Sequence, residues 1–251
     1  MQIIVKNIAT EYTDEGEGSV ILLLHGWQSN LHTFDAITSL LSKKLRVIRL
    51  DLPGFGKTEM PPSAWHIDDY AQFVAEFIRK LGIELKYIAG HSFGGRVIIK
   101  AIATETIHPK KIILIASAGV AERRKTRAAI IKILTKTGSA IMWIPPLIFW
   151  RTKMRERLYG YLGSDYLDAG NLKETYLNII KEDLSLSAKE IKKPTLLIWG
   201  DHDVATPIKE GLRLSHLIKG STLKVIEGAG HFVHQEQPQR VAEYMNTFLH
   251  D

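Results

Sequence analysis

One serine of the chain, Ser92, lies in the pattern Gly-x-Ser-x-Gly at residues 90–94. An apolar run from Lys86 to Ala89 precedes the pattern, and a helical run from Arg96 to Ala103 follows it. A serine on such a tight strand-turn-helix corner is exposed for attack on a carbonyl carbon, and the two glycines leave room where strand and helix cross. The pattern therefore predicts a nucleophile at Ser92.

A histidine in a glycine-rich loop is the candidate base. His231 follows Gly228-Ala229-Gly230, after the last predicted strand and before the C-terminal helix. Such a loop can carry the imidazole over the edge of a sheet to the serine. The plainer interpretation is a surface histidine without a role. The chain order serine, acid, histidine is one of the known orders of a triad, and it favours His231.

The acid is expected on the loop at residues 199–207, where two aspartates compete. Asp203 fits an arrangement Gly-x-x-Asp-x-x-x-Pro, whereas Asp201 is better suited to accept hydrogen bonds from turn amides. We therefore predict that Asp203 holds the histidine in the correct tautomer and stabilises its imidazolium form.

Acyl transfer also needs two fixed N–H donors where negative charge develops on the carbonyl oxygen. An apolar run from Ser19 to Leu24 leads directly into His25-Gly26-Trp27. The predicted donors are the backbone amides of Phe93 and Trp27. Gly26 would let this loop approach closely, and His25 is interpreted as support for the loop.

Other chemistries lack the residues that they need. Residues 54–58 (GFGKT) resemble the end of a phosphate-binding loop, but Asp51 occupies the position of its first glycine. The chain has no cysteine, no H-E-x-x-H and no G-x-G-x-x-G. No metal and no cofactor are predicted.

These side chains must be positioned by a sheet. Short runs that are apolar on both faces alternate with helical patterns such as residues 68–81, which is typical of a doubly wound, mostly parallel α/β sheet. The predicted strands are Ser19–Leu24, Arg46–Leu50, Lys86–Ala89, Lys111–Ala116, Thr195–Trp199 and Thr222–Ile226.

The alternation fails at residues 119–187, which are predicted to form a helical cap inserted into a core of residues 1–118 and 188–251. The most apolar stretch of the cap could pack against the core or line an apolar tunnel for an acyl chain. Packing against the core is the favoured interpretation. That stretch includes Met142, Trp143, Pro145, Pro146, Phe149 and Trp150.

Charge and composition limit the partners. The chain has 251 residues, 45% of them hydrophobic, and a net charge of +6. Residues 121–158 carry ten Lys or Arg and two acidic residues, so the rest of the chain has a net charge of −2. Such local basicity argues against nucleic-acid binding and leaves contact of the basic cap with an anionic membrane as a minor alternative. Residues 1–10 contain one short apolar run, broken by Lys6, which is too little for a signal peptide. Residues 141–150 are apolar but contain two prolines and are far shorter than the ~20 residues that a membrane span needs, so a cytoplasmic location is expected.

Together, His25-Gly26-Trp27, the run from Asp51 to Gly56, residues 90–94, Asp203 and His231 resemble the α/β-hydrolase superfamily. The resemblance implies an α/β-hydrolase fold with a triad of Ser, Asp and His, and the chain looks like a small serine carboxylesterase or lactonase. Epoxide hydrolases and haloalkane dehalogenases carry aspartate where this chain has Ser92.

The expected activity is hydrolysis of a small or medium-chain carboxylic ester through an acyl-enzyme. Two alternatives use the same triad: an acyl-homoserine-lactone type lactonase and a C–C bond hydrolase. A binding protein without catalytic activity is a further alternative on this fold, but such proteins usually lack part of the triad. The expected partner is thus a small-molecule ester or lactone.

Overall fold

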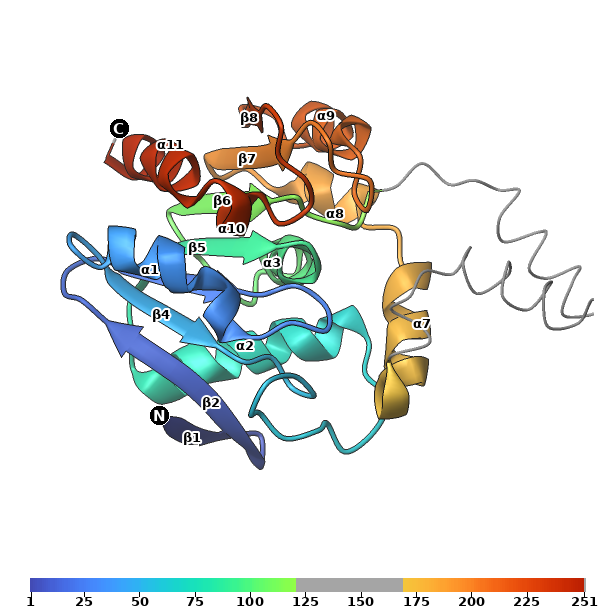
Figure 1. The fold of residues 1–251 in the computed structure, drawn as a ribbon. Helices are drawn as coiled ribbons and strands as arrows, with labels where there is room; N and C mark the ends of the chain where they lie inside the picture. The colour runs from blue at the N-terminus through green and yellow to red at the C-terminus, as the bar shows by residue number, and fades with distance from the viewer. Residues whose placement is uncertain (121–168, 251) are drawn as a thin grey trace, which may run out of the picture. The chain divides into compact units, whose positions relative to one another are not determined.

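The computed structural model describes residues 1–120 and 169–250 (Figure 1). Within these residues the strands form one eight-stranded sheet in the order β1-β2-β4-β3-β5-β6-β7-β8. From β4 to β8 in this order neighbouring strands are parallel, whereas β2 is antiparallel to β1 and β4. The strands are Gln2–Val5 (β1), Ile8–Glu15 (β2), Val20–Leu24 (β3), Arg46–Leu50 (β4), Leu85–His91 (β5), Lys111–Ile115 (β6), Thr195–Gly200 (β7) and Thr222–Ile226 (β8).

Helices cover both faces of this sheet (Figure 1). On one face, α1 contacts α10 and α11, and on the other α3 contacts α2 and α8 while α9 packs on α8 and β7. The first group consists of α1 (Asp35–Leu41), α10 (Val233–Glu236) and α11 (Pro238–His250), and the second of α2 (Ile67–Leu81), α3 (Phe93–Ala103), α8 (Ser185–Glu190) and α9 (Ile208–Leu217). The remaining helical segments of the described residues are η1 (Leu31–Phe34), η3 (Gly170–Leu172) and α7 (Lys173–Lys181).

The central strands are buried on both sides, as a sheet with helices on two faces requires. All five residues of β3 are buried. Successive side chains of a strand point to opposite faces, so Ile21 and Leu23 join the core beneath α1 and α11. The same core contains Phe34, Ile37, Leu41, Val241, Met245 and Leu249.

The predicted fold class is confirmed, and all six predicted strands are present with ends within two residues of the prediction. The predicted helix at residues 68–81 is α2. The hairpin of β1 and β2 was not predicted, because its strands are only partly buried, the apolar run of β1 is only three residues long and β2 is mostly polar. Lys6 and Asn7 form its turn with φ values of 48° and 62°, the left-handed conformation that two-residue hairpin loops favour.

The chain divides into two compact units, one formed by residues 1–121 and 177–251 and the other by residues 122–176. The predicted cap, residues 119–187, contains the second unit, but its residues 121–168 lie outside the described residues. The stretch proposed as a tunnel or a packing surface, residues 142–150, lies there too. Among the helices of residues 1–120 and 169–250, none has the length and apolar character needed to cross a membrane.

The chain leaves and re-enters the first unit at neighbouring points. The N–H of Leu184 donates to the carbonyl of Gly119 at 2.9 Å. Two cations of α3 hold the returning segment: Arg96 donates to the carbonyl of Glu182 at 2.6 Å, and Lys100 contacts its carboxylate at 2.9 Å. The helix that begins next to Ser92 is therefore fastened to both the sheet and this segment.

Candidate active site

Ser92 occupies a sharp turn between the end of β5 and the start of α3. Its φ of 48° lies in the left-handed region, which non-glycine residues rarely adopt outside functional sites. A Cβ atom on Gly94 would lie 2.2 Å from the carbonyl oxygen of Leu24, and one on Gly90 would lie 2.6 Å from the carbonyl carbon of Gly94. Both glycines of the pattern are therefore required by the packing of strand against helix.

Asp203 and His231 are brought together by the loops that follow β7 and β8. Oδ2 of Asp203 lies 2.8 Å from Nδ1 of His231. The carboxylate is buried, and its Oδ1 accepts hydrogen bonds from the amides of Ala205 at 2.9 Å and Thr206 at 2.8 Å. Burial opposes ionisation of Asp203, but the hydrogen bonds from His231 and Thr206 outweigh it and lower its pKa. The acid is therefore ionised at neutral pH, and Nε2 of the imidazole is left for chemistry.

The other aspartate of this loop has a different partner. Asp201 accepts a hydrogen bond from the N–H of Gly228 at 2.8 Å, and it thereby ties the loop after β7 to the loop after β8. The structure thus places Asp203, and not Asp201, against the Nδ1 of His231.

His231 lies beside the residue that precedes Ser92. The Nε2–H of His91 donates to the carbonyl of His231 at 2.9 Å, and the two ring centroids are 4.7 Å apart. Within the described residues no hydrogen bond joins the Ser92 hydroxyl to His231. Catalytic hydrogen bonds of this kind often tighten only in the complex with substrate.

The loop after β3 approaches the serine closely. A Cβ atom on Gly26 would lie 2.8 Å from Nδ1 of His91 and 3.5 Å from Cβ of Ser92, so only glycine fits without displacing His91. Trp27, the next residue, packs edge-on against the ring of Phe93 with centroids 5.3 Å apart. The amide of Phe93 is the first of α3 and has no acceptor within the helix. The two predicted oxyanion donors therefore belong to residues in contact with each other.

His25 is fully buried beneath this loop. Its Nδ1–H donates to the carbonyl of Gly26 at 2.7 Å, and its Nε2 accepts from the amide of Leu52 at 2.9 Å. Burial lowers the pKa of His25, so the ring is neutral and its tautomer is fixed by these two bonds. The side chain links the loop after β3 to the loop after β4.

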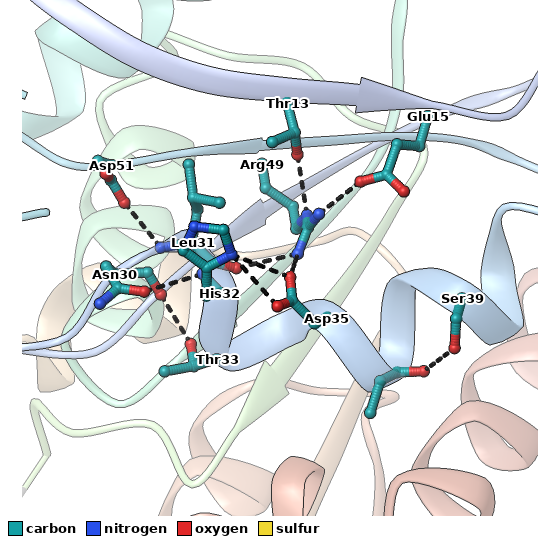
Figure 2. Close-up of polar contacts among 11 residues, drawn as sticks. Thr13, Glu15, Asn30, Leu31, His32, Thr33, Asp35, Ser39, Arg49 and Asp51 are labelled. Atoms are coloured by element: carbon teal, nitrogen blue, oxygen red, sulfur yellow. Dashed lines mark hydrogen bonds and ion pairs between the residues drawn. The ribbon is translucent and has the colours of Figure 1, made fainter. Parts of the chain in front are cut away.

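A buried cation holds the same loop farther along (Figure 2). Arg49 of β4 donates to the carbonyl of Leu31 at 3.2 Å, and Asp51 accepts from the amide of Leu31 at 2.7 Å. The guanidinium, whose residue is only 4% exposed, also donates to Thr13, Glu15 and Asp35. Leu31, four residues after Trp27, is thus held through both its backbone N–H and its backbone carbonyl.

Two further residues near the base were not predicted from sequence. Thr206 contacts both Asp203 and His231, although its only sequence signal is its place just before Pro207. His234 is fully buried, with its ring centroid 4.4 Å from that of His91, and neither of its ring nitrogens has a hydrogen-bond partner among the described residues. Its place in the first turn of α10 gave no signal beyond helical spacing.

Across residues 1–120 and 169–250, no group of three or more His, Cys, Asp or Glu side chains is arranged to hold a metal ion.

Comparisons with known proteins agree with the fold. A family model described as the alpha/beta hydrolase family matches residues 21–244. The chain is similar to a protein of Bacillus subtilis (strain 168) named Uncharacterized hydrolase YugF, with 24% identity over 258 residues that cover 97% of this chain and 94% of that protein.

Two solved structures share the fold over the whole chain. One is an enol-lactonase from Burkholderia xenovorans LB400, with a TM-score of 0.76, 22% identity and complete coverage (100%) of both chains. The other is a thermophilic esterase from Thermogutta terrifontis, with a TM-score of 0.75 and 22% identity over 100% of this chain and 97% of that one. At these identities the likeness shows the fold alone.

Proposed function

This chain belongs to the alpha/beta hydrolase family, and from that premise we propose that it hydrolyses carboxylic esters through an acyl-enzyme formed on Ser92. The observation that carries the proposal is the 2.8 Å contact between Asp203 and His231, on loops that bring His231 beside the neighbour of Ser92. A serine on a strained turn with an oriented histidine nearby is the arrangement that nucleophilic acyl transfer needs.

In the first half of the proposed reaction, Oγ of Ser92 attacks the carbonyl carbon of the ester while Nε2 of His231 takes the hydroxyl proton. The carbonyl electrons move to the oxygen, where the amides of Phe93 and Trp27 donate to the developing negative charge. Asp203, which is ionised, stabilises the imidazolium through Nδ1.

The tetrahedral species collapses when the bond to the alcohol oxygen breaks and His231 returns the proton to the departing alkoxide. A water molecule then gives a proton to His231 and attacks the acyl carbon. Collapse of the second tetrahedral species releases the carboxylic acid, and His231 restores the proton to Ser92.

The substrate class proposed is an ester or its cyclic form, a lactone. The similarity to the enol-lactonase supports including lactones, since ring opening uses the same attack on a carbonyl carbon. Cleavage of a C–C bond next to a carbonyl group is the remaining alternative, because it too can begin with a serine on this fold.

The proposal is tested with Ser92→Ala and with Ser39→Ala as a matched control, because Ser39 is an exposed serine on α1. Wild type and Ser39→Ala should react with a fluorophosphonate and hydrolyse nitrophenyl esters. Ser92→Ala should remain folded, resist labelling and lose hydrolysis by roughly 10⁶-fold in kcat.

A panel of esters, lactones and a vinylogous diketone then separates the substrate classes. Hydrolysis by Ser92→Ala at the wild-type rate would contradict the assignment of the nucleophile. Cleavage of the diketone alone, with no turnover of esters or lactones, would replace the ester proposal with C–C hydrolysis.

A further inference from the structure

One hydroxyl group lies between the acid and the base. Oγ1 of Thr206 is 2.8 Å from Oδ2 of Asp203 and 3.2 Å from Nδ1 of His231. It is also 3.0 Å from the carbonyl oxygen of Ala116, at the end of β6. The side chain therefore reaches three groups that come from three different loops of the sheet edge.

A hydroxyl has one proton and two lone pairs, so it cannot serve all three groups as a donor. When its proton points to Asp203, both carboxylate oxygens are held by Thr206, since its amide already donates to Oδ1 at 2.8 Å. When its proton points to Ala116, the oxygen is free to accept from the Nδ1–H of His231 as a second acceptor beside the carboxylate. Both arrangements keep the proton of His231 on Nδ1.

Thr206 is itself held rigidly. Its residue is 5% exposed, and its carbonyl accepts a hydrogen bond at 2.7 Å from the indole N–H of Trp199, which is fully buried in β7. Ala116 has a φ of 43°, and its N–H donates to the carbonyl of Ile198 at 2.9 Å. The hydroxyl is thus fixed by buried strands and not by a surface loop.

We propose that Thr206 is a positioning residue for the acid–base pair, which acts by fixing the carboxylate of Asp203 and the Nδ1–H of His231 relative to each other. This inference rests on the proposed function, because only an acid–base role for His231 makes the orientation of its proton matter to a rate. No other side-chain hydroxyl of the described residues hydrogen bonds to both members of this pair.

The test compares Thr206→Val, which removes the hydroxyl at nearly constant volume, with Thr206→Ser, which retains it. Thr206→Val should lower kcat by roughly 10- to 100-fold, the range seen when the outer partner of a functional side chain is lost, with little change in KM. Thr206→Ser should restore most of kcat. Thr195→Val is the matched control, because Thr195 is also buried and donates only to a backbone carbonyl.

A second variant keeps the test possible if Thr206→Val is unfolded. If Thr206→Val does not fold, Thr206→Ala takes its place, since it removes the same hydroxyl without setting a methyl group against the carboxylate. Wild-type kcat in a folded variant without the hydroxyl would overturn the proposal. So would a Thr206→Ser variant that is as slow as Thr206→Val.

A readout without turnover separates this inference from the proposed function. The downfield proton resonance of the His231 Nδ1–H, identified by its loss in His231→Gln, should move in Thr206→Val and stay near its wild-type position in Thr206→Ser. If the wild-type protein cleaves no ester but the resonance responds in this way, the proposed ester hydrolysis is wrong, whereas the proposed positioning role of Thr206 is supported. A resonance that keeps its wild-type position in Thr206→Val would overturn the proposed positioning role.

Discussion

Four histidines near the serine have different environments, and their partners decide what each can do. His25 has two partners that fix a neutral tautomer, and His91 has one, the carbonyl of His231. His234 has none among the described residues, and burial lowers its pKa to about 3. His231 alone pairs with a carboxylate while keeping its side chain 17% exposed. Of the four, it is the one whose contacts match the acid–base role proposed above.

The two aspartates of the loop after β7 provide a matched pair of variants. Asp203→Asn should lower kcat by roughly 10³- to 10⁴-fold, because an amide can stabilise the wrong tautomer of His231 and cannot stabilise the imidazolium. Asp201→Asn should change kcat only slightly, since its Oδ1 can still accept from the amide of Gly228. Ester hydrolysis by purified variants with equal far-UV circular dichroism provides the measurement. A greater loss from Asp201→Asn would assign the acid to the other position.

For single residues, the sequence predicted those candidate site residues that lie in a recognisable pattern, and it gave no sign of those that do not. Ser92 and the glycines on either side can be read from one five-residue pattern, and the choice of Asp203 over Asp201 followed from distances along the chain. Thr206 and His234 could not be found in this way, because their significance arises from contacts with residues distant in sequence. A threonine before a proline and a histidine in a helix carry no chemical signal by themselves.

At the scale of elements, the carboxyl ends of β3, β5, β7 and β8 supply the candidate groups, while β4 supplies the supports. Arg49 lies on β4, and Asp51 directly follows this strand. Both hydrogen bond to the backbone of Leu31 in the loop that carries Trp27 (Figure 2). Leu24 of β3 pairs in register with Leu50 of β4, which explains why side chains of one strand reach the loop of the next. The loop that carries Trp27, the proposed oxyanion donor, is thus held partly by an ion-pair network on a neighbouring strand.

Removal of the buried guanidinium of Arg49 should therefore lower stability more than removal of an exposed ion pair would. Arg49→Met should lower the free energy of unfolding by about 1–3 kcal/mol, because it leaves the carbonyl of Leu31 without this donor and Asp35 and Glu15 without their cation. It should also lower kcat by loosening the loop. Urea denaturation and ester hydrolysis measure the two effects.

Arg46→Met is the matched control, because Arg46 lies on the same strand and pairs with Asp14 at a more exposed site. Exposed ion pairs contribute about 0–1 kcal/mol, so this variant should differ little from wild type. Equal losses of stability in the two variants would show that burial of Arg49 has no special importance.

The elements themselves were largely predictable because most of the sheet is buried on both faces. Strand β3 consists of aliphatic residues throughout, and β6 does so after Lys111. Parallel pairing of such strands requires long crossover connections, usually helices, between them. The β1–β2 hairpin escaped prediction because its partial burial gives a mixed pattern. The bracing of one loop by a neighbouring strand also depends on strand order, which local patterns do not specify.

For the whole molecule, the buried histidines make stability depend on pH. The rings of His91 and His234 pack against each other with a tilt of 48°, and burial lowers the pKa of both. In the unfolded chain each would have a pKa near the ordinary 6.5. As the pH falls below that value, the unfolded state binds protons that the folded state does not, so the folded state loses stability. The lowered pKa of Asp203 acts in the same direction at lower pH.

Replacement of His234 by phenylalanine should weaken this acid sensitivity. For His234 the window runs from pH 6.5 down to the folded pKa of about 3, with a loss of about 1.4 kcal/mol per pH unit within it. His234→Phe keeps an aromatic ring against Phe34 and His91 but cannot take up a proton. Urea denaturation at pH 7 and pH 5 should therefore show a smaller decrease in this variant than in wild type.

His108→Gln serves as the control, since His108 is an exposed histidine. It should retain the wild-type pH dependence. An unchanged slope in His234→Phe would mean that acid sensitivity arises elsewhere in the molecule.

The hydrogen bond between Leu184 and Gly119 has a consequence for how such a chain can change. The two segments of the first unit that flank the second unit along the chain are thus joined directly to each other, whatever the length of the chain between them. Mutation and recombination can therefore lengthen, shorten or exchange the intervening segment while the strands that position Ser92, Asp203 and His231 keep their places.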